Sequence, residues 1–352
     1  MDRLTFFKQG LSSAMDAVSA VVGLKKAVNS FTEAVDEALS DIKSDIGLHM
    51  HSLESDMYEG GSHTLKEVAR MGYTTIETDS YFWGKIYDLK PDAFRKAADE
   101  AGLKITSAHL RKYYEDDLPE PQSAAETAEE EAGSETAADR GAAATAEVKA
   151  DAGKAYGTDA GRESAQGGDA TATEDPVMKW WNEALDTHKA LGCQYIVISR
   201  MPEAMTAENV LAYAKYFVRI ADKVLQRGMK LCLHPSRREL TATDGVSLFD
   251  TIAANTPADK VWFELDTREA HEAGIDMVSM LKHYKGRVLL MHLHDYGIAT
   301  ESGLIDFDKI VAEAIATGVK DIFVEVRSYT LPPKNCVERS IYNLESLPSL
   351  RF

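Results

Sequence analysis

The stretch Lys282-His283-Tyr284-Lys285-Gly286-Arg287-Val288-Leu289-Leu290-Met291-His292-Leu293-His294 contains the unit from which the whole fold is predicted. A helical segment ends at Gly286, a residue that readily adopts the left-handed conformation of a helix C-cap. The apolar run Val288–His294 that follows predicts a β-strand. The stretch therefore indicates a helix, a capping glycine and a strand, in that order.

The same order recurs along the chain. Strands are predicted at Ile46–Ser52, Thr74–Thr78, Lys104–Leu110, Tyr195–Ser199, Lys230–His234, Val261–Asp266, Val288–His294 and Asp321–Val326. Helices are predicted at Thr64–Met71, Pro91–Ala101, Val177–Leu191, Ala207–Arg227, Gly245–Ala254, Asp276–His283, Phe307–Thr317 and Asn335–Leu347. A strand followed by a helix, repeated in this way, favours an α/β fold, a closed parallel (β/α)₈ TIM barrel, with a doubly wound open sheet as the alternative.

Residues 1–45 precede the predicted barrel. Apolar residues recur there at roughly helical spacing, which predicts an N-terminal helical extension. The segment Arg3-Leu4-Thr5-Phe6-Phe7-Lys8 is similar to a twin-arginine export signal that lacks its second arginine. We therefore expect a cytoplasmic protein, with export to the periplasm as the alternative.

Residues 115–175 interrupt the barrel after its third strand. They contain 17 acidic and 4 basic residues and, apart from alanine, few apolar ones. Such a segment cannot bury enough apolar surface to offset the entropy lost on ordering, so this long acidic insertion is predicted to be disordered. The barrel domain accordingly spans 46–352 around it. The formal net charge of −18 argues against nucleic acid as a partner, and no apolar run is long enough to span a membrane.

Polar residues close most of the predicted strands. In a (β/α)₈ barrel the carboxyl ends of the strands meet at one mouth, where catalytic residues gather. The candidates at these ends are His49, His51, Glu77, Asp79, His109, His234, Glu239, Glu264, Asp266, His292, His294, Glu325 and Arg327. Alternation along a strand places His292 and His294 on one face, and Glu264 and Asp266 on one face. A set of two imidazoles and two carboxylates, formed by His234, Asp266, His292 and Glu325, suits a divalent metal ion.

The chain resembles the xylose isomerase-like barrels known as sugar phosphate isomerases/epimerases. The resemblance rests on Ile46–Leu48, Thr64–Tyr73, Gly102–His109, Phe263–Asp266, His292–Asp295 and Phe323–Glu325, and covers 46–110 and 177–347. It implies a metal held by residues that end strands five to eight, and Asp266, His292 and Glu325 match the last three. At strand five the usual His-Asn-His is replaced by His234-Pro235-Ser236, with Glu239 beyond it, so His234 and Glu239 are both candidate metal ligands.

The resemblance also implies a reaction. It indicates a metal-dependent isomerase, epimerase or lyase that abstracts a proton from a small sugar or keto-sugar and stabilises an enediolate. Mn²⁺ is the expected cofactor, with Co²⁺, Zn²⁺ and Mg²⁺ as alternatives. Glu325 and Glu239 are the candidate catalytic bases and His294 is a candidate acid, whereas Glu77, His109, Trp83 and Arg327 are predicted to bind the substrate. The alternative is a non-catalytic carbohydrate-binding or scaffold barrel, and assembly into a homo-oligomer is left open.

Overall fold

The structure is a computed structural model that describes residues 46–113 and 175–350. The predicted helical extension over 1–45 and all but the last residue of the predicted acidic insertion over 115–175 lie outside these residues. Within the described parts of the chain, no helix is both long and apolar enough to cross a bilayer.

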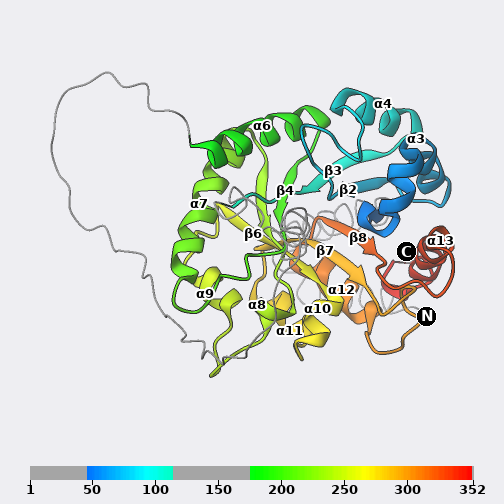
Figure 1. Cartoon of the computed structure of the whole chain (residues 1–352). Coiled ribbons are helices and arrows are strands. Elements are labelled where there is room, and N and C mark those ends of the chain that lie inside the picture. The colour runs from blue at the N-terminus through cyan, green and yellow to red at the C-terminus, as the bar shows by residue number, and fades with distance from the viewer. Residues whose placement is uncertain (1–45, 114–174, 351–352) are drawn as a thin grey trace, which may run out of the picture. The chain divides into compact units, whose positions relative to one another are not determined.

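Eight parallel strands close into a barrel in which β8 pairs with β1. The strands are β1 (Ile46–His49), β2 (Thr75–Thr78), β3 (Lys104–His109), β4 (Tyr195–Ile198), β5 (Lys230–Leu233), β6 (Val261–Asp266), β7 (Val288–His294) and β8 (Asp321–Glu325). Figure 1 shows these strands at the centre and the helices around them. The predicted (β/α)₈ barrel is confirmed, and the open doubly wound sheet is excluded because both edges of the sheet are paired.

Helices connect the successive strands. The longer ones are α3 (Glu54–Arg70), α4 (Pro91–Ala101), α6 (Pro176–Leu191), α7 (Val210–Gln226), α9 (Leu248–Ala254), α11 (Met277–His283), α12 (Phe307–Thr317) and α13 (Pro333–Leu344). Each corresponds to a predicted helix, although α3 begins at Glu54 rather than at Thr64. The chain ends its described part in the short turn η4 (Pro348–Leu350).

The first strand is shorter than predicted. It ends at His49, and the chain then forms a 3₁₀ turn, η1 (Met50–Leu53), that leads into α3. The prediction of a strand through Ser52 was wrong because Met50 and Leu53, three residues apart, lie on one side of a helical turn and are both buried. His51 therefore lies on this turn and not on the strand.

Two short helices at the mouth of the barrel were not predicted. They are α8 (Arg237–Leu240), which follows β5, and α10 (Thr267–Glu272), which follows β6. Ser236 and Glu239 form a reciprocal capping box at the start of α8, and the carboxylate of Asp266 caps α10 by accepting from the backbone N–H groups of Arg268 and Glu269. Residues that the sequence analysis treated as ligands thus also start helices.

Ring contacts establish which residues of β6 face outward. The Phe263 ring packs against the rings of Phe249 in α9 and Tyr284, with centroids 4.7 and 5.4 Å apart, so Phe263 faces the helices. Because side chains alternate along a strand, the neighbouring Glu264 faces the barrel interior, and so does Asp266. The predicted common face of these two carboxylates is confirmed.

The lower part of the interior is packed around Gly47. A Cβ at this position would lie 2.4 Å from a ring carbon of Phe323 and 2.5 Å from the hydroxyl of Thr75. Phe323 in turn packs edge-on against His292, with ring centroids 6.2 Å apart. Gly47 therefore leaves the space for an aromatic floor beneath the polar interior.

Replacing Gly47 with alanine is expected to destabilise the fold by about 1–3 kcal/mol, because overpacking a filled core forces its neighbours to move. Urea unfolding followed by circular dichroism measures this free energy. Gly60→Ala is the matched control, since a Cβ there meets only one side-chain atom, 4.0 Å away. Equal stability of the two variants would contradict the tight packing at Gly47.

Candidate active site

Charged side chains fill the interior at the carboxyl ends of the strands in two layers. The deep layer contains Glu77, His109, Glu264 and His292, and the upper layer contains Asp266, His294 and Glu325. All seven are buried. Strands β6 and β7 each supply one residue to each layer, because Glu264 and Asp266, like His292 and His294, are two positions apart.

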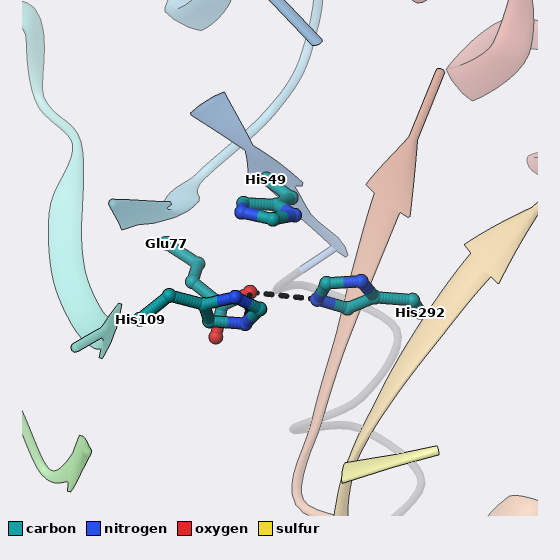
Figure 2. A group of neighbouring side chains, drawn as sticks. All are labelled: His49, Glu77, His109 and His292. Atoms are coloured by element: carbon teal, nitrogen blue, oxygen red, sulfur yellow. Dashed lines mark hydrogen bonds and ion pairs between the residues drawn. The ribbon is translucent and has the colours of Figure 1, made fainter. Parts of the chain in front are cut away.

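The deep layer joins residues from strands that are not neighbours in the barrel. His292 Nε2 lies 2.6 Å from Glu77 Oε2 and 3.4 Å from Glu264 Oε1. His109 Nε2 lies 2.8 Å from Glu264 Oε2 and 3.1 Å from Glu77 Oε2. His49 lies beside them, with its ring centroid 4.4 Å from that of His109 (Figure 2). Since β2, β3, β6 and β7 contribute, these contacts cross the interior of the barrel.

The upper layer is centred on Asp266 and Glu325. His294 Nδ1 lies 2.9 Å from Asp266 Oδ2, and the other oxygen of Asp266 is held by the α10 cap. Glu325 Oε2 lies 2.9 Å from His292 Nδ1, while Glu325 Oε1 accepts from Arg327 Nε at 2.5 Å. His292 therefore contacts the upper layer with one ring nitrogen and the deep layer with the other.

The two candidate ligands after strand five have different surroundings. His234 lies with its ring centroid 5.0 Å from that of His292, and its Nε2 is buried without a hydrogen-bond partner among the described residues. Glu239 Oε2 instead accepts from the N–H and hydroxyl of Ser236, at 2.8 and 2.7 Å, and its Oε1 accepts from Arg238 at 2.6 Å. Of these two residues, His234 thus lies beside the buried charged side chains. Both carboxylate oxygens of Glu239 already accept hydrogen bonds at the start of α8.

The other residues predicted to bind substrate are dispersed. Glu77 and His109 lie in the deep layer, where each contacts residues of the barrel interior. Arg327 lies at the mouth, partly exposed and bonded to Glu325. Trp83 occupies the turn between Phe82 and Lys85 that follows β2, and its side chain is 98% exposed. Glu77, His109 and Arg327 therefore lie within or at the edge of the buried charged group. The Trp83 ring does not contact that group and is exposed to solvent.

The carboxylates of the interior are ionised because imidazoles surround them. Burial alone would raise the pKa of Glu77, but His109 and His292 outweigh it and hold that pKa well below the ordinary value. Burial likewise opposes ionisation of Glu325, yet His49 and His292 keep its pKa well below the ordinary value. The pKa of Asp266 is lowered by His294 against the effect of burial. The interior therefore pairs ionised carboxylates with imidazoles whose pKa values are raised in turn.

The histidines divide into two kinds. Burial lowers the pKa of His109, but the carboxylates of Glu77 and Glu264 outweigh it and raise the pKa to about 10. Burial and the neighbouring His292 lower the pKa of His234 to about 4, and burial and His109 lower the pKa of His49. His234 and His49 are therefore neutral near pH 7, which is the form of imidazole that binds a metal ion.

Several of these residues lie close enough to share a cation. Four sets have one candidate ligand atom per residue within 4.8 Å of one another, in the part of the chain that the structure describes: His234, Asp266 and His292; Asp266, His294 and Glu325; His49, Glu77, His109 and His292; and His51, Glu54 and Asp79. The first two sets share Asp266. Together they contain all the predicted metal ligands except Glu239, and they add His294.

The barrel is similar in fold to several solved structures. A sugar phosphate isomerase/epimerase from Parabacteroides distasonis is 22% identical, with a TM-score of 0.67 over 88% of this chain and 100% of that one. An L-ribulose 3-epimerase is 13% identical, with a TM-score of 0.56 over 86% of this chain and 93% of that one. The IolI protein with a zinc atom bound is 14% identical, with a TM-score of 0.54 over 88% and 99%. The chain has the xylose isomerase-like barrel fold.

This fold is the one that the sequence resemblance implied, and the similarity extends over nearly the full length of each solved structure. Neither the models of protein families nor the sequences of curated proteins match the chain. The xylose isomerase-like fold is therefore established by its three-dimensional similarity, and the chemistry of the site has to be argued from the residues themselves.

Two residues that matter for the geometry were given no role in the sequence analysis. Glu264 contacts both His109 and His292, and His49 lies between the two layers, with Nδ1 3.3 Å from Glu325 Oε1. Both stand near the ends of strands, and Glu264 shares the face of Asp266. That shared face was the available signal for Glu264, whereas nothing local distinguishes His49 from His51.

Proposed function

We propose that this chain is a divalent-cation-dependent enzyme that moves a proton on a small sugar or keto-sugar, in an isomerisation, an epimerisation or an elimination. The observation that carries the proposal is the interior group itself, in which buried carboxylates and imidazoles converge at the carboxyl ends of the strands. The names of the solved structures with this fold, such as L-ribulose 3-epimerase, support the choice of a sugar.

The residues fit a divalent cation. His234 Nε2 is buried and, among the described residues, has no hydrogen-bond partner, and Asp266 Oδ2 is the oxygen that its helix cap leaves available. We propose that His234, Asp266, His292 and Glu325 hold the ion, Mn²⁺ in the first place, with Co²⁺, Zn²⁺ and Mg²⁺ as alternatives. When bound, the ion supplies a Lewis acid that draws electron density from substrate oxygens.

The proton is handled by residues of the chain. Asp266 Oδ2 orients the His294 ring through Nδ1, and His294 Nε2 is buried and without a hydrogen-bond partner among the described residues. Burial would lower the pKa of His294, but Asp266 outweighs it and raises that pKa, which favours the protonated form of the ring. We propose that His294 Nε2 delivers or accepts the proton, as an acid–base group oriented by a carboxylate.

In this proposal Glu325 supplies a negative charge next to the substrate, and Arg327 binds an anionic group of the substrate. Glu325 is ionised and held in place by His292 and Arg327. We propose that its carboxylate accepts a proton from the substrate or a hydrogen bond from a substrate hydroxyl. Arg327 donates to Glu325 through Nε, and we propose that its remaining guanidinium N–H groups meet a phosphate or carboxylate of the substrate. In this proposal Glu77 and His109 hold His292 in place from the deep layer and do not contact the substrate directly.

Exchange of substrate hydrogen for solvent deuterium tests the proposal. A panel of keto-sugars, 3-keto-glycosides and sugar phosphates is incubated with the protein and Mn²⁺ in D₂O, and the ion is removed before NMR spectra are recorded. Deuterium is expected at a carbon next to the carbonyl of at least one compound, and only when the cation is present. Binding of a sugar without any exchange would instead support a non-catalytic carbohydrate-binding barrel.

A further inference from the structure

A second group of ligand atoms joins His49 to three residues of the deep layer, and the proposed function uses only His292 of this group as a ligand. His49, Glu77, His109 and His292 come from β1, β2, β3 and β7, and one ligand atom of each lies within 4.8 Å of the other three. All four side chains are buried. Figure 2 draws this group, with the Glu77 carboxylate joined to His292 by an ion pair.

This group is separate from the first. Three of its four members lie on β1 to β3, whereas His234, Asp266 and Glu325 follow or end β5, β6 and β8. His292 is shared, but through different atoms. Its Nδ1 lies 2.9 Å from Glu325 Oε2 and 3.9 Å from Asp266 Oδ2, while its Nε2 lies 2.6 Å from Glu77 Oε2. The two nitrogens of one ring thus face two different groups.

Two members of this group, His49 and Glu77, have buried polar atoms without a hydrogen-bond partner among the described residues. Neither ring nitrogen of His49 has a hydrogen-bond partner in the described parts of the chain, although the ring is fully buried. The nearby carboxylate oxygens of Glu325 and Asp79 lie 3.3 and 3.9 Å from these nitrogens. Glu77 Oε1 is also buried without a hydrogen bond there. Each such atom costs about 1–3 kcal/mol unless something satisfies it.

The charges in this layer match one divalent cation. Glu77 and Glu264 are two carboxylates in contact with the same two imidazoles, since His109 Nε2 lies 3.1 and 2.8 Å from them. His292 Nε2 lies 2.6 and 3.4 Å from them. One doubly charged ion takes the place of the protons that His109 and His292 otherwise carry beside these carboxylates, so binding it leaves the enclosed charge unchanged. An uncompensated charge at this depth would be strongly unfavourable.

The donor atoms indicate which ion fits. Three imidazole nitrogens and one carboxylate oxygen form a set that Zn²⁺ binds in tetrahedral geometry at about 2.0–2.1 Å, which places the ligand atoms about 3.3 Å apart. The present separations lie on both sides of that value, from 2.6 Å between His292 and Glu77 to at most 4.8 Å.

We propose that His49, Glu77, His109 and His292 bind a second divalent cation, Zn²⁺, beneath the first site. With both ions bound, the His292 ring is an imidazolate that ligates the deep ion through Nε2 and the upper ion through Nδ1, and the N–H proton that it loses goes to solvent. The deep ion fixes the orientation of His292 from below and so orients its Nδ1 toward the upper group. The proposal concerns binding alone and holds whichever reaction the upper site performs.

Metal stoichiometry tests it. The full chain is stripped with a chelator, reloaded with Zn²⁺, freed of excess ion and measured by elemental mass spectrometry. Two Zn²⁺ per chain are expected in the wild type and in His188→Gln, a control histidine that is equally buried but belongs to neither group. His49→Gln and Glu77→Gln are each expected to retain one. A wild-type value of one that these two variants do not change overturns the deep site and leaves the upper one standing.

Titration of the metal-free wild-type protein with Co²⁺ tests the same proposal without relying on substituted proteins. Co²⁺ added to the stripped chain is expected to produce visible ligand-field bands until two equivalents are bound, with bands typical of a tetrahedral site in one of the two steps. An end point at one equivalent overturns the proposal. The upper site is judged separately by Asp266→Asn, which is expected to remove one equivalent and leave the deep one.

Discussion

Asp266→Asn is expected to lower kcat/KM by roughly a thousand-fold or more and to remove the cation of the upper site, because the loss of Lewis-acid assistance is worth several kcal/mol of transition-state stabilisation. Asp266 Oδ2 is the acidic oxygen that faces His292 and His294, and its replacement by an amide removes the negative charge. Kinetics on the substrate found by deuterium exchange, together with metal content, measure the effect.

The substitution is chosen so that the fold is spared. Asparagine retains an oxygen that can accept from the N–H groups of Arg268 and Glu269, so the cap of α10 is preserved. Asp276→Asn is the matched control, since Asp276 caps α11 in the same way and lies outside the groups of candidate ligands. Full activity and full metal content in Asp266→Asn would contradict the proposed site.

His294→Gln is expected to lower kcat by about 10²–10⁴-fold while the upper cation is retained, since a positioned acid–base group contributes about that much. The variant keeps a polar side chain but has no group that titrates. Deuterium exchange into the substrate is expected to slow by the same factor, because the substitution affects the proton-transfer step. His271→Gln is the control, because His271 lies on α10, bonds to Tyr296 in an exposed contact and belongs to none of the groups of candidate ligands.

A second variant separates a proton-transfer role from a structural one. His294→Ala leaves a space beside Asp266, and added imidazole is expected to restore part of the lost activity in a pH-dependent way. His294 also belongs to a group of candidate ligands with Asp266 and Glu325. Loss of the cation in His294→Gln would therefore show that His294 is a metal ligand. Unchanged kcat would exclude His294 from the reaction.

Much of the fold follows from local patterns. Helix-capping glycines such as Gly102 and Gly318 adopt the left-handed conformation at the ends of α4 and α12, as their positions predicted. Alternation along β6 and β7 predicted which carboxylates and imidazoles share a face, and the contacts across the interior confirm it. Period-two alternation and glycine caps are properties of a short segment, so a sequence displays them directly.

The arrangement across the barrel could not be predicted in the same way. The register between strands shifts at Ile76/Glu77 and at Phe263/Glu264, next to the two deep carboxylates. These irregularities set the depth at which Glu77 and Glu264 meet His109 and His292. They arise from the packing of whole strands and leave no local sequence pattern.

Glu239 and Trp83 illustrate two other reasons why the surroundings of a side chain could not be predicted from the sequence. The Ser236-x-x-Glu239 spacing is a capping-box signature, and the resemblance to a metal-ligand position obscured it. Trp83 stands in a tight turn with a positive φ of 46° and its ring is in solvent, so its predicted contact with a substrate stays a prediction. A local backbone conformation decided its orientation, whereas the general tendency of aromatic rings to be buried did not.

The most direct test of the account is to locate the cation. Crystals of the full chain soaked in Mn²⁺ and measured by anomalous diffraction are expected to show a peak about 2.0–2.3 Å from side-chain atoms of Asp266, His292 and Glu325, with His234 beside it. Ordered side chains at these four positions with no anomalous peak between them would contradict the account.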